Sequence, residues 1–188
     1  GGLDRGRIFS GLGAQNPIRV APMKSKRLAS LTLAALALTS SHMNADDPIV
    51  FVSTFAGGDK GGINALRLSL ADGKLSQVAR TGGVENPFFL AISPDQKFLY
   101  CNHAKQFSGK EDEQVAAYAV DKATGTLTLL NRQSSRGTAS CYVEVDGTGK
   151  TVLVANYTTG NVASLPVKDD GSLGEPVSFF QHEGAGGD

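Results

Sequence analysis

The chain has 188 residues, enough for one domain with a proper core or two small ones, and its 23 Gly and lack of Trp favour turns and strands over a helical bundle. Its 18 Lys and Arg balance 18 Asp and Glu, but residues 1–45 carry a net charge of +5 and residues 46–188 a net charge of −5. A mildly acidic folded part without a Lys/Arg cluster excludes a typical polyanion binder, so we expect no nucleic-acid partner.

The first element along the chain is a pattern typical of a secretory signal peptide, over residues 23–45. A basic start at Met23 is followed by an apolar run of 11 residues, Leu28 to Leu38, and then by small and polar residues. The run is too short for a membrane span, which needs about 20 apolar residues. We therefore expect a cleaved signal, a mature chain that starts near Asp46, and a periplasmic or extracellular location. The alternative is an uncleaved amphipathic or core helix.

Residues 1–22 lie upstream of Met23 and show no periodicity. We interpret them as a spurious upstream extension and expect translation to begin at Met23.

Three apolar segments share an alternating pattern and a similar polar end: residues 49–55, 98–103 and 151–157. Alignment of Thr54, Asn102 and Asn156 gives offsets of 48 and 54 residues. Each segment is followed by another strand and a Gly turn, and the second and third are preceded by a strand and turn at 89–97 and 142–150. The sequence therefore repeats one unit.

A unit of about 50 residues with four short strands and polar turns is typical of a β-propeller blade. With the strands named a to d from the channel to the rim, the chain reads b-c-d, a-b-c-d, a-b-c-d. We expect an all-β fold with about three blades, in which residues 46–188 form the N-terminal part of a propeller and the last d strand spans residues 176–180.

The combined pattern resembles the seven-bladed lactonase family, which is typified by bacterial propeller-type 6-phosphogluconolactonases and is similar to the fungal carboxymuconate cyclases. The segments that carry the resemblance are residues 53–63, 86–95, 97–100, 123–127, 142–146, 154–162 and 165–167. The resemblance covers residues 49–183. It implies a lactone hydrolase that acts on a small sugar lactone, needs no cofactor and is a monomer at full length.

Members of this family carry further site residues in later blades, including a Pro-His-x-His stretch that follows a segment like His182-Glu183-Gly184. The resemblance therefore implies that the main catalytic residues lie beyond Asp188. We also expect these 188 residues to be inactive by themselves, because an open arc of about three blades exposes two blade faces. Two other functions remain open. One is an exported propeller that binds or scaffolds without chemistry, and the other is a muconate-type lactonising enzyme.

Consecutive turns of an up-and-down meander alternate between two faces, so the d–a and b–c loops share one face. Lactone hydrolysis needs a base that works near neutral pH, donors for the oxyanion and cations for a substrate phosphate. His103 and His182, both on this face, are the candidate catalytic residues. The candidate substrate-binding residues at the same face are Glu85, Asn86, Arg136, Asn156 and Tyr157. The alternative roles are solvated loop histidines and, for the two asparagines, turn formers.

The sequence contains no GxSxG, HExxH, CxxC or P-loop motif, so we expect neither a metal nor a nucleotide cofactor. Its two cysteines, Cys101 and Cys141, could form a disulfide in an exported protein or remain buried thiols.

Overall fold

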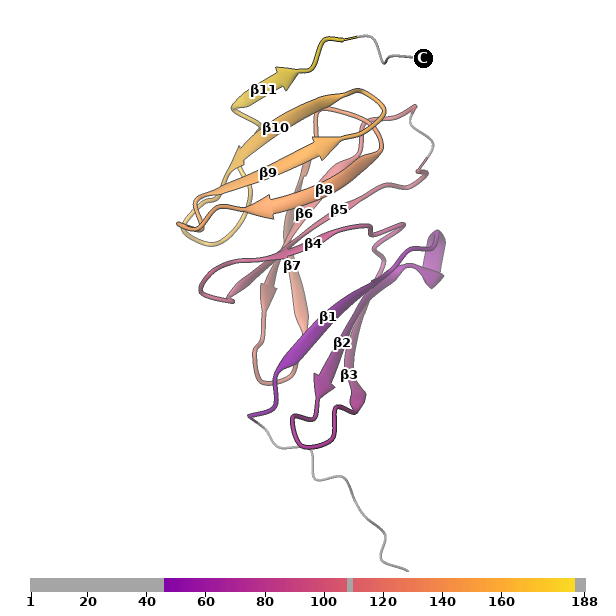
Figure 1. The fold of residues 1–188 in the computed structure, drawn as a ribbon, viewed down its shortest axis with the longest axis vertical. Coiled ribbons are helices and arrows are strands. Elements are labelled where there is room, and N and C mark those ends of the chain that lie inside the picture. The colour runs from indigo at the N-terminus through magenta and orange to yellow at the C-terminus, as the bar shows by residue number, and fades with distance from the viewer. Residues whose placement is uncertain (1–45, 108–109, 185–188) are drawn as a thin grey trace, which may run out of the picture. The chain divides into compact units, whose positions relative to one another are not determined.

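The structure is a computed structural model that describes residues 46–107 and 110–184. Within these ranges the chain forms three antiparallel sheets, each of which pairs its strands in chain order (Figure 1). The expectation of an all-β chain in about three blades is confirmed. The predicted upstream extension (1–22) and signal peptide (23–45) lie outside the described residues.

We number the sheets as blades 1 to 3. Blade 1 contains β1 (Ile49–Thr54), β2 (Gly62–Leu68) and β3 (Leu75–Gly82), with a short 3-10 turn, η1 (Gly58–Lys60), before β2. Blade 2 contains β4 (Leu90–Ile92), β5 (Phe98–His103), β6 (Gln114–Val120) and β7 (Leu127–Ser134). Blade 3 contains β8 (Ser140–Val145), β9 (Thr151–Asn156), β10 (Asn161–Pro166) and β11 (Ser178–Gln181).

Two apolar clusters hold the blades together. The cluster between blades 1 and 2 contains Ile63, Val84, Leu99, Cys101, Ala116, Tyr118 and Leu127. The cluster between blades 2 and 3 is built around Tyr100, Val115, Ala117, Val143, Val152, Val154 and Leu165. Leu99 and Tyr100 are neighbours in β5 yet belong to different clusters, because successive side chains of a strand point to opposite faces. Blade 2 is therefore buried on both faces, and the loops at its ends contact both neighbours.

The turn between the last two strands of each blade requires a glycine. Gly73, Gly125 and Gly171 occupy this turn in blades 1, 2 and 3 with φ angles of 73°, 75° and 84°. This left-handed backbone conformation is unfavourable for residues with a Cβ atom. The Gly turns that repeat along the sequence thus mark three equivalent chain reversals.

The structure corrects the alignment of the repeats by one residue in blade 2. Thr54, His103 and Asn156 are the last residues of β1, β5 and β9, and each pairs with the first residue of the next strand. The offsets are therefore 49 and 53 residues. Alignment by residue type had instead matched Asn102 with Asn156.

Both cysteines are free thiols, Cys101 buried and Cys141 half-buried. Burial raises the pKa of the Cys101 thiol to about 12, so this side chain is an inert part of the cluster between blades 1 and 2. Among the described residues, no helix is long and apolar enough to cross a bilayer.

Candidate functional site

His103 ends β5 and points toward blade 1, on the same side of the strand as Leu99 and Cys101. Its side chain is only 8 % exposed, and its Nε2 atom has no hydrogen-bond partner among the described residues. Burial, assisted by the positive charge of Arg132, lowers the pKa of His103 from 6.5 to about 4. At neutral pH His103 is therefore a neutral imidazole with an uncommitted ring nitrogen.

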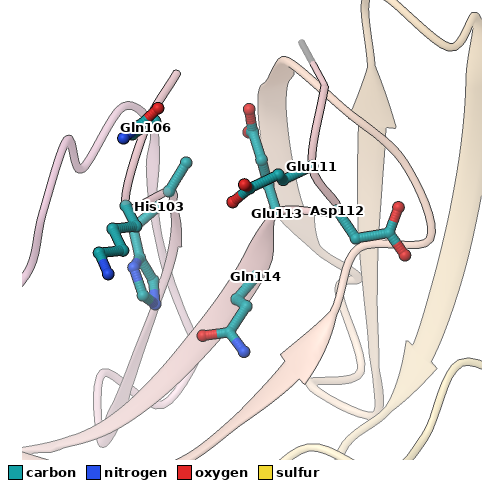
Figure 2. A pocket seen from close by; sticks show the side chains of 8 residues that line it. His103, Gln106, Glu111, Asp112, Glu113 and Gln114 are labelled. Carbon is teal, nitrogen blue, oxygen red and sulfur yellow. The ribbon is translucent and has the colours of Figure 1, made fainter. Parts of the chain in front are cut away.

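Two cavities of about 230 and 260 Å³ meet at His103. The first is lined by the two ends of the β5–β6 loop, and Figure 2 shows His103 and Gln106 on one side of it, with Glu111 and Asp112 on the other. The second lies between blades 1 and 2. Besides His103, its lining residues are Gly58, Asp59, Gly83, Glu85, Lys105, Gln114 and Arg132.

The second cavity combines opposite charges with neutral polar groups. Lys105 and Arg132 supply two cations, and Asp59 and Glu85 supply two carboxylates. The Arg132 guanidinium also donates a hydrogen bond of 3.3 Å to the carbonyl of Gly83, which joins the outer strand of blade 2 to the loop that follows blade 1. The cavity thus offers a proton acceptor, hydrogen-bond donors and cations in one place.

Glu113 is a buried carboxylate in the wall of the first cavity, and it holds blade 3 in position. Its two oxygens accept hydrogen bonds from the backbone N–H groups of Ala139 (2.9 Å) and Ser140 (2.7 Å), at the start of β8. Burial raises the pKa of Glu113, and these two donors act against that rise. Because both oxygens are committed to backbone donors, Glu113 acts as a clamp between blades 2 and 3.

Among the predicted substrate-binding residues, Glu85 lines the second cavity together with His103. Asn86 follows it with a φ of 45°, and its side-chain amide donates to the carbonyls of Ala104 and Lys105 at 3.1 and 3.2 Å. The side-chain amide of Asn86 therefore holds the loop that carries Lys105 in place.

Asn156 is buried, donates to the carbonyl of Ser135 at 2.9 Å and accepts a hydrogen bond from the Ser140 hydroxyl at 2.6 Å. These contacts fix the loop that connects blades 2 and 3. Asn156 occupies the position of blade 3 that His103 occupies in blade 2. At this strand position the Asn156 side chain of blade 3 is hydrogen-bonded within the protein, whereas the His103 ring of blade 2 keeps a nitrogen without a partner among the described residues.

The remaining predicted residues lie at blade 3. Tyr157 is 80 % exposed. The Arg136 guanidinium lies 5.7 Å from the centre of the Phe179 ring, and the His182 ring lies 5.1 Å from that of Phe180. Neither cavity at His103 is lined by His182, Asn86, Arg136, Asn156 or Tyr157. Of the seven predicted site residues, the structure brings together only His103 and Glu85.

Sequence reasoning missed Arg132 and Gln114 as parts of this site. Gln114 reaches the cavity because it pairs with His103 across the β5–β6 ladder. Arg132 lies in β7 and pairs with Ala116, two residues further along β6. A run of four polar residues at the end of an outer strand, Asn131 to Ser134, is the available signal, and only the strand register connects it to His103. Among the described residues, no group of three or more His, Cys, Asp or Glu is arranged to hold a metal ion.

Comparisons with known proteins give a consistent result. The family described as "Lactonase, 7-bladed beta-propeller" matches residues 49–188. A 6-phosphogluconolactonase of Bacillus subtilis is 37 % identical over 138 residues, which are 73 % of this chain and 38 % of the relative. A 6-phosphogluconolactonase of Formosa agariphila is 28 % identical over the same length, with the same coverage of both chains. The chain thus spans well under half the length of these curated relatives.

Solved structures agree with the sequence matches. A provisionally assigned 6-phosphogluconolactonase from Bacteroides fragilis superposes with a TM-score of 0.67 at 30 % identity, over 77 % of this chain and 39 % of that one. The periplasmic gluconolactonase PpgL of Pseudomonas aeruginosa superposes with a TM-score of 0.64 at 28 % identity, over 72 % of this chain and 39 % of that one. The chain therefore belongs to the seven-bladed β-propeller lactonase family.

Proposed function

We propose that the full-length protein hydrolyses the lactone of a phosphorylated sugar acid, as a 6-phosphogluconolactonase does. The observation that carries this proposal is the similarity to the Bacillus subtilis enzyme of that name. The cavity at His103 adds chemical support, because it holds the groups that such a reaction uses.

In this proposal His103 is the general base. Its neutral imidazole takes a proton from a water molecule as the water oxygen attacks the lactone carbonyl carbon. The acyl C–O bond of the ring then breaks, and the departing ring oxygen takes the proton back from the imidazolium. Lactone and water become one open-chain hydroxy acid, with no oxidant or cofactor consumed. Lys105 and Arg132 offer positive charge to the oxyanion or to the phosphate group of the substrate.

His182, the second predicted catalytic residue, is exposed beyond β11 and lines neither cavity at His103. Of the two predicted catalytic histidines, we therefore assign proton abstraction to His103. Glu85 is assigned a substrate-binding role in the second cavity.

The test is a pH-stat assay of the full-length protein with 6-phosphoglucono-1,5-lactone, at mildly acidic pH where spontaneous hydrolysis is slow. We expect proton release well above the background rate, and release at the background rate would contradict the proposal. Binding of the sugar phosphate without hydrolysis would instead support the binding or scaffold function.

A second candidate substrate is the unphosphorylated glucono-1,5-lactone. It is favoured by the signal-peptide pattern of residues 23–45 together with the likeness to a periplasmic gluconolactonase, because phosphorylated sugar lactones are cytoplasmic metabolites. We propose export of the protein on the same grounds. The pH-stat assay distinguishes the two substrates: a higher kcat/KM for the unphosphorylated lactone would assign glucono-1,5-lactone as the substrate.

A further inference from the structure

Five aromatic side chains from all three blades form one continuous row, which we call the aromatic arc: Phe55, Phe107, Phe88, Phe89 and Tyr142. Phe55 follows β1 in blade 1, Phe88 and Phe89 precede β4 in blade 2, and Tyr142 lies in β8 of blade 3. Neighbouring ring centres are 5.4 to 5.5 Å apart, mostly in edge-to-face contact. The blades therefore share one aromatic surface.

The arc follows the inner strands of the propeller. β4 and β8 are the first strands of blades 2 and 3, which in a propeller line the central channel. Phe89 is fixed by its backbone N–H, which donates to the Asn102 side chain at 2.6 Å, and the Tyr142 hydroxyl donates to Glu144. Phe88, Phe89 and Tyr142 thus lie at the channel side of blades 2 and 3 rather than at the rim.

The arc is incompletely buried. Each of its five side chains is between 38 and 50 % exposed, although apolar side chains of this size usually lose most of their surface to a core. Edge-to-face contact also leaves part of each ring face open. A contiguous exposed apolar surface of this kind marks a binding site more often than a packing defect.

The arc and the His103 cavities share their loops. The β5–β6 loop supplies Lys105 and Gln106 to the first cavity and Phe107 to the arc. On the other side, Glu85 lines the second cavity and Phe88 begins the blade 2 part of the arc, only three residues later. Along the chain, the aromatic surface therefore adjoins residues of a polar cavity with two cations.

We infer that the aromatic arc is a stacking subsite for the pyranose ring of the substrate, an inference that rests on the proposed function. A sugar ring presents apolar C–H groups on its faces and hydroxyl groups around its edge. The arc can cover the C–H face, while Lys105 and Arg132 in the adjoining cavity attract the anionic group of the same molecule. Mostly apolar surfaces with a few charged groups are the usual composition of small-molecule sites.

The test measures binding of glucose 6-phosphate, which has the ring and the phosphate but cannot be hydrolysed as a lactone. Phe89→Leu and Tyr142→Leu remove an aromatic face from the full-length protein and keep an apolar side chain. Tyr142→Phe is the matched control, because it keeps the ring and removes only the hydroxyl. We expect Kd to rise about three- to tenfold in both Leu variants, as for loss of one aromatic contact, and to stay near the wild-type value in the control. Saturation-transfer NMR should show the ring C–H protons of the sugar closest to the protein.

An unchanged Kd in both Leu variants, or no binding by the wild type, would overturn the stacking subsite. The lactone assay separates this outcome from failure of the proposed function. Hydrolysis with the same KM in wild type and Leu variants would contradict the stacking subsite and support the proposed lactone hydrolysis. Sugar-phosphate binding that depends on the arc, without any hydrolysis, would support the stacking subsite and contradict the proposed hydrolysis.

Discussion

His103 links the proposed chemistry to the pH dependence of the fold. Its pKa is about 4 in the folded protein and about 6.5 in an unfolded chain. Between these values the unfolded state binds more protons, so the free energy of unfolding falls as the pH drops from 6.5 toward 4. Full protonation costs up to about 3 kcal/mol, since the side chain is largely buried. Urea denaturation across this range should show the fall in wild type and a smaller one in His103→Gln; equal slopes would contradict the assignment.

The same pKa sets the expected activity profile. A general base must be deprotonated, so the acid limb of kcat/KM should lie near pH 4 rather than near 6.5. A pH-rate profile of the full-length protein checks this expectation. A limb near 6.5 would assign the base to an exposed histidine instead of His103.

Glu113 gives a second prediction at this scale. Glu113→Gln leaves a single side-chain oxygen for the two N–H groups of Ala139 and Ser140, so one buried donor loses its acceptor. We expect a loss of about 1–3 kcal/mol in the free energy of unfolding, measured by chemical denaturation. The exposed neighbour variant, Glu111→Gln, should change it by less than about 0.5 kcal/mol. Equal effects of the two variants would show that Glu113 is no clamp.

Residue types alone made His103 and Glu85 candidates, because a histidine and a carboxylate at one face of the blades are chemically suggestive. They could not separate these two from Asn86 and Asn156. Both asparagines have the same polar character, but the backbone carbonyls that take up their amides come from other loops and are visible only in the fold.

At the scale of elements, the turn glycines make a matched pair. A Cβ atom on Gly171 would lie 2.1 Å from the Phe98 ring, whereas one on Gly73 would meet nothing within 4 Å. Both residues have positive φ, so alanine costs about 1–2 kcal/mol at each. Gly171→Ala should lose about 1–3 kcal/mol more than Gly73→Ala, because it also overpacks the contact between blades 2 and 3. Denaturation midpoints of the two variants provide the measurement, and equal losses would contradict the packing described.

Alternating polarity located the strands but shortened β2 and β6. The alternating segments span residues 65–68 and 117–120, whereas the strands begin three residues earlier, at Gly62 and Gln114. Backbone hydrogen bonds between strands form at residues of any polarity. The alternation of polar and apolar residues therefore marks only part of each paired strand. The misplaced Asn102 alignment has the same cause, because strand position is set by pairing rather than by residue type.

At the scale of the whole molecule, the blades and the family could be predicted because each repeat is local in sequence. The candidate site could not, because it joins η1, the loop after β3, the end of β5 and the middle of β7 across two blades. The packing of blade 1 on blade 2 places Glu85 beside His103, and the strand register within blade 2 places Arg132 there.

Export is a further prediction about the molecule as a whole. The basic start, the short apolar run and the small residues before Asp46 should direct removal of residues up to about Ala45. Intact-mass and N-terminal peptide measurements on protein isolated from its native host should find a mature chain that starts near Asp46. A retained Met23 in the purified protein would contradict the export pathway.

The most direct test of the central claim, lactone hydrolysis at the cavity between blades 1 and 2, is the kcat/KM of full-length His103→Gln for 6-phosphoglucono-1,5-lactone. Lys74→Gln, on an exposed turn of blade 1, serves as the control. We expect kcat/KM to fall about 10²- to 10⁴-fold in His103→Gln, the usual contribution of a general base, and to stay unchanged in the control. A His103→Gln protein that stays folded and hydrolyses the lactone at the wild-type rate would contradict it.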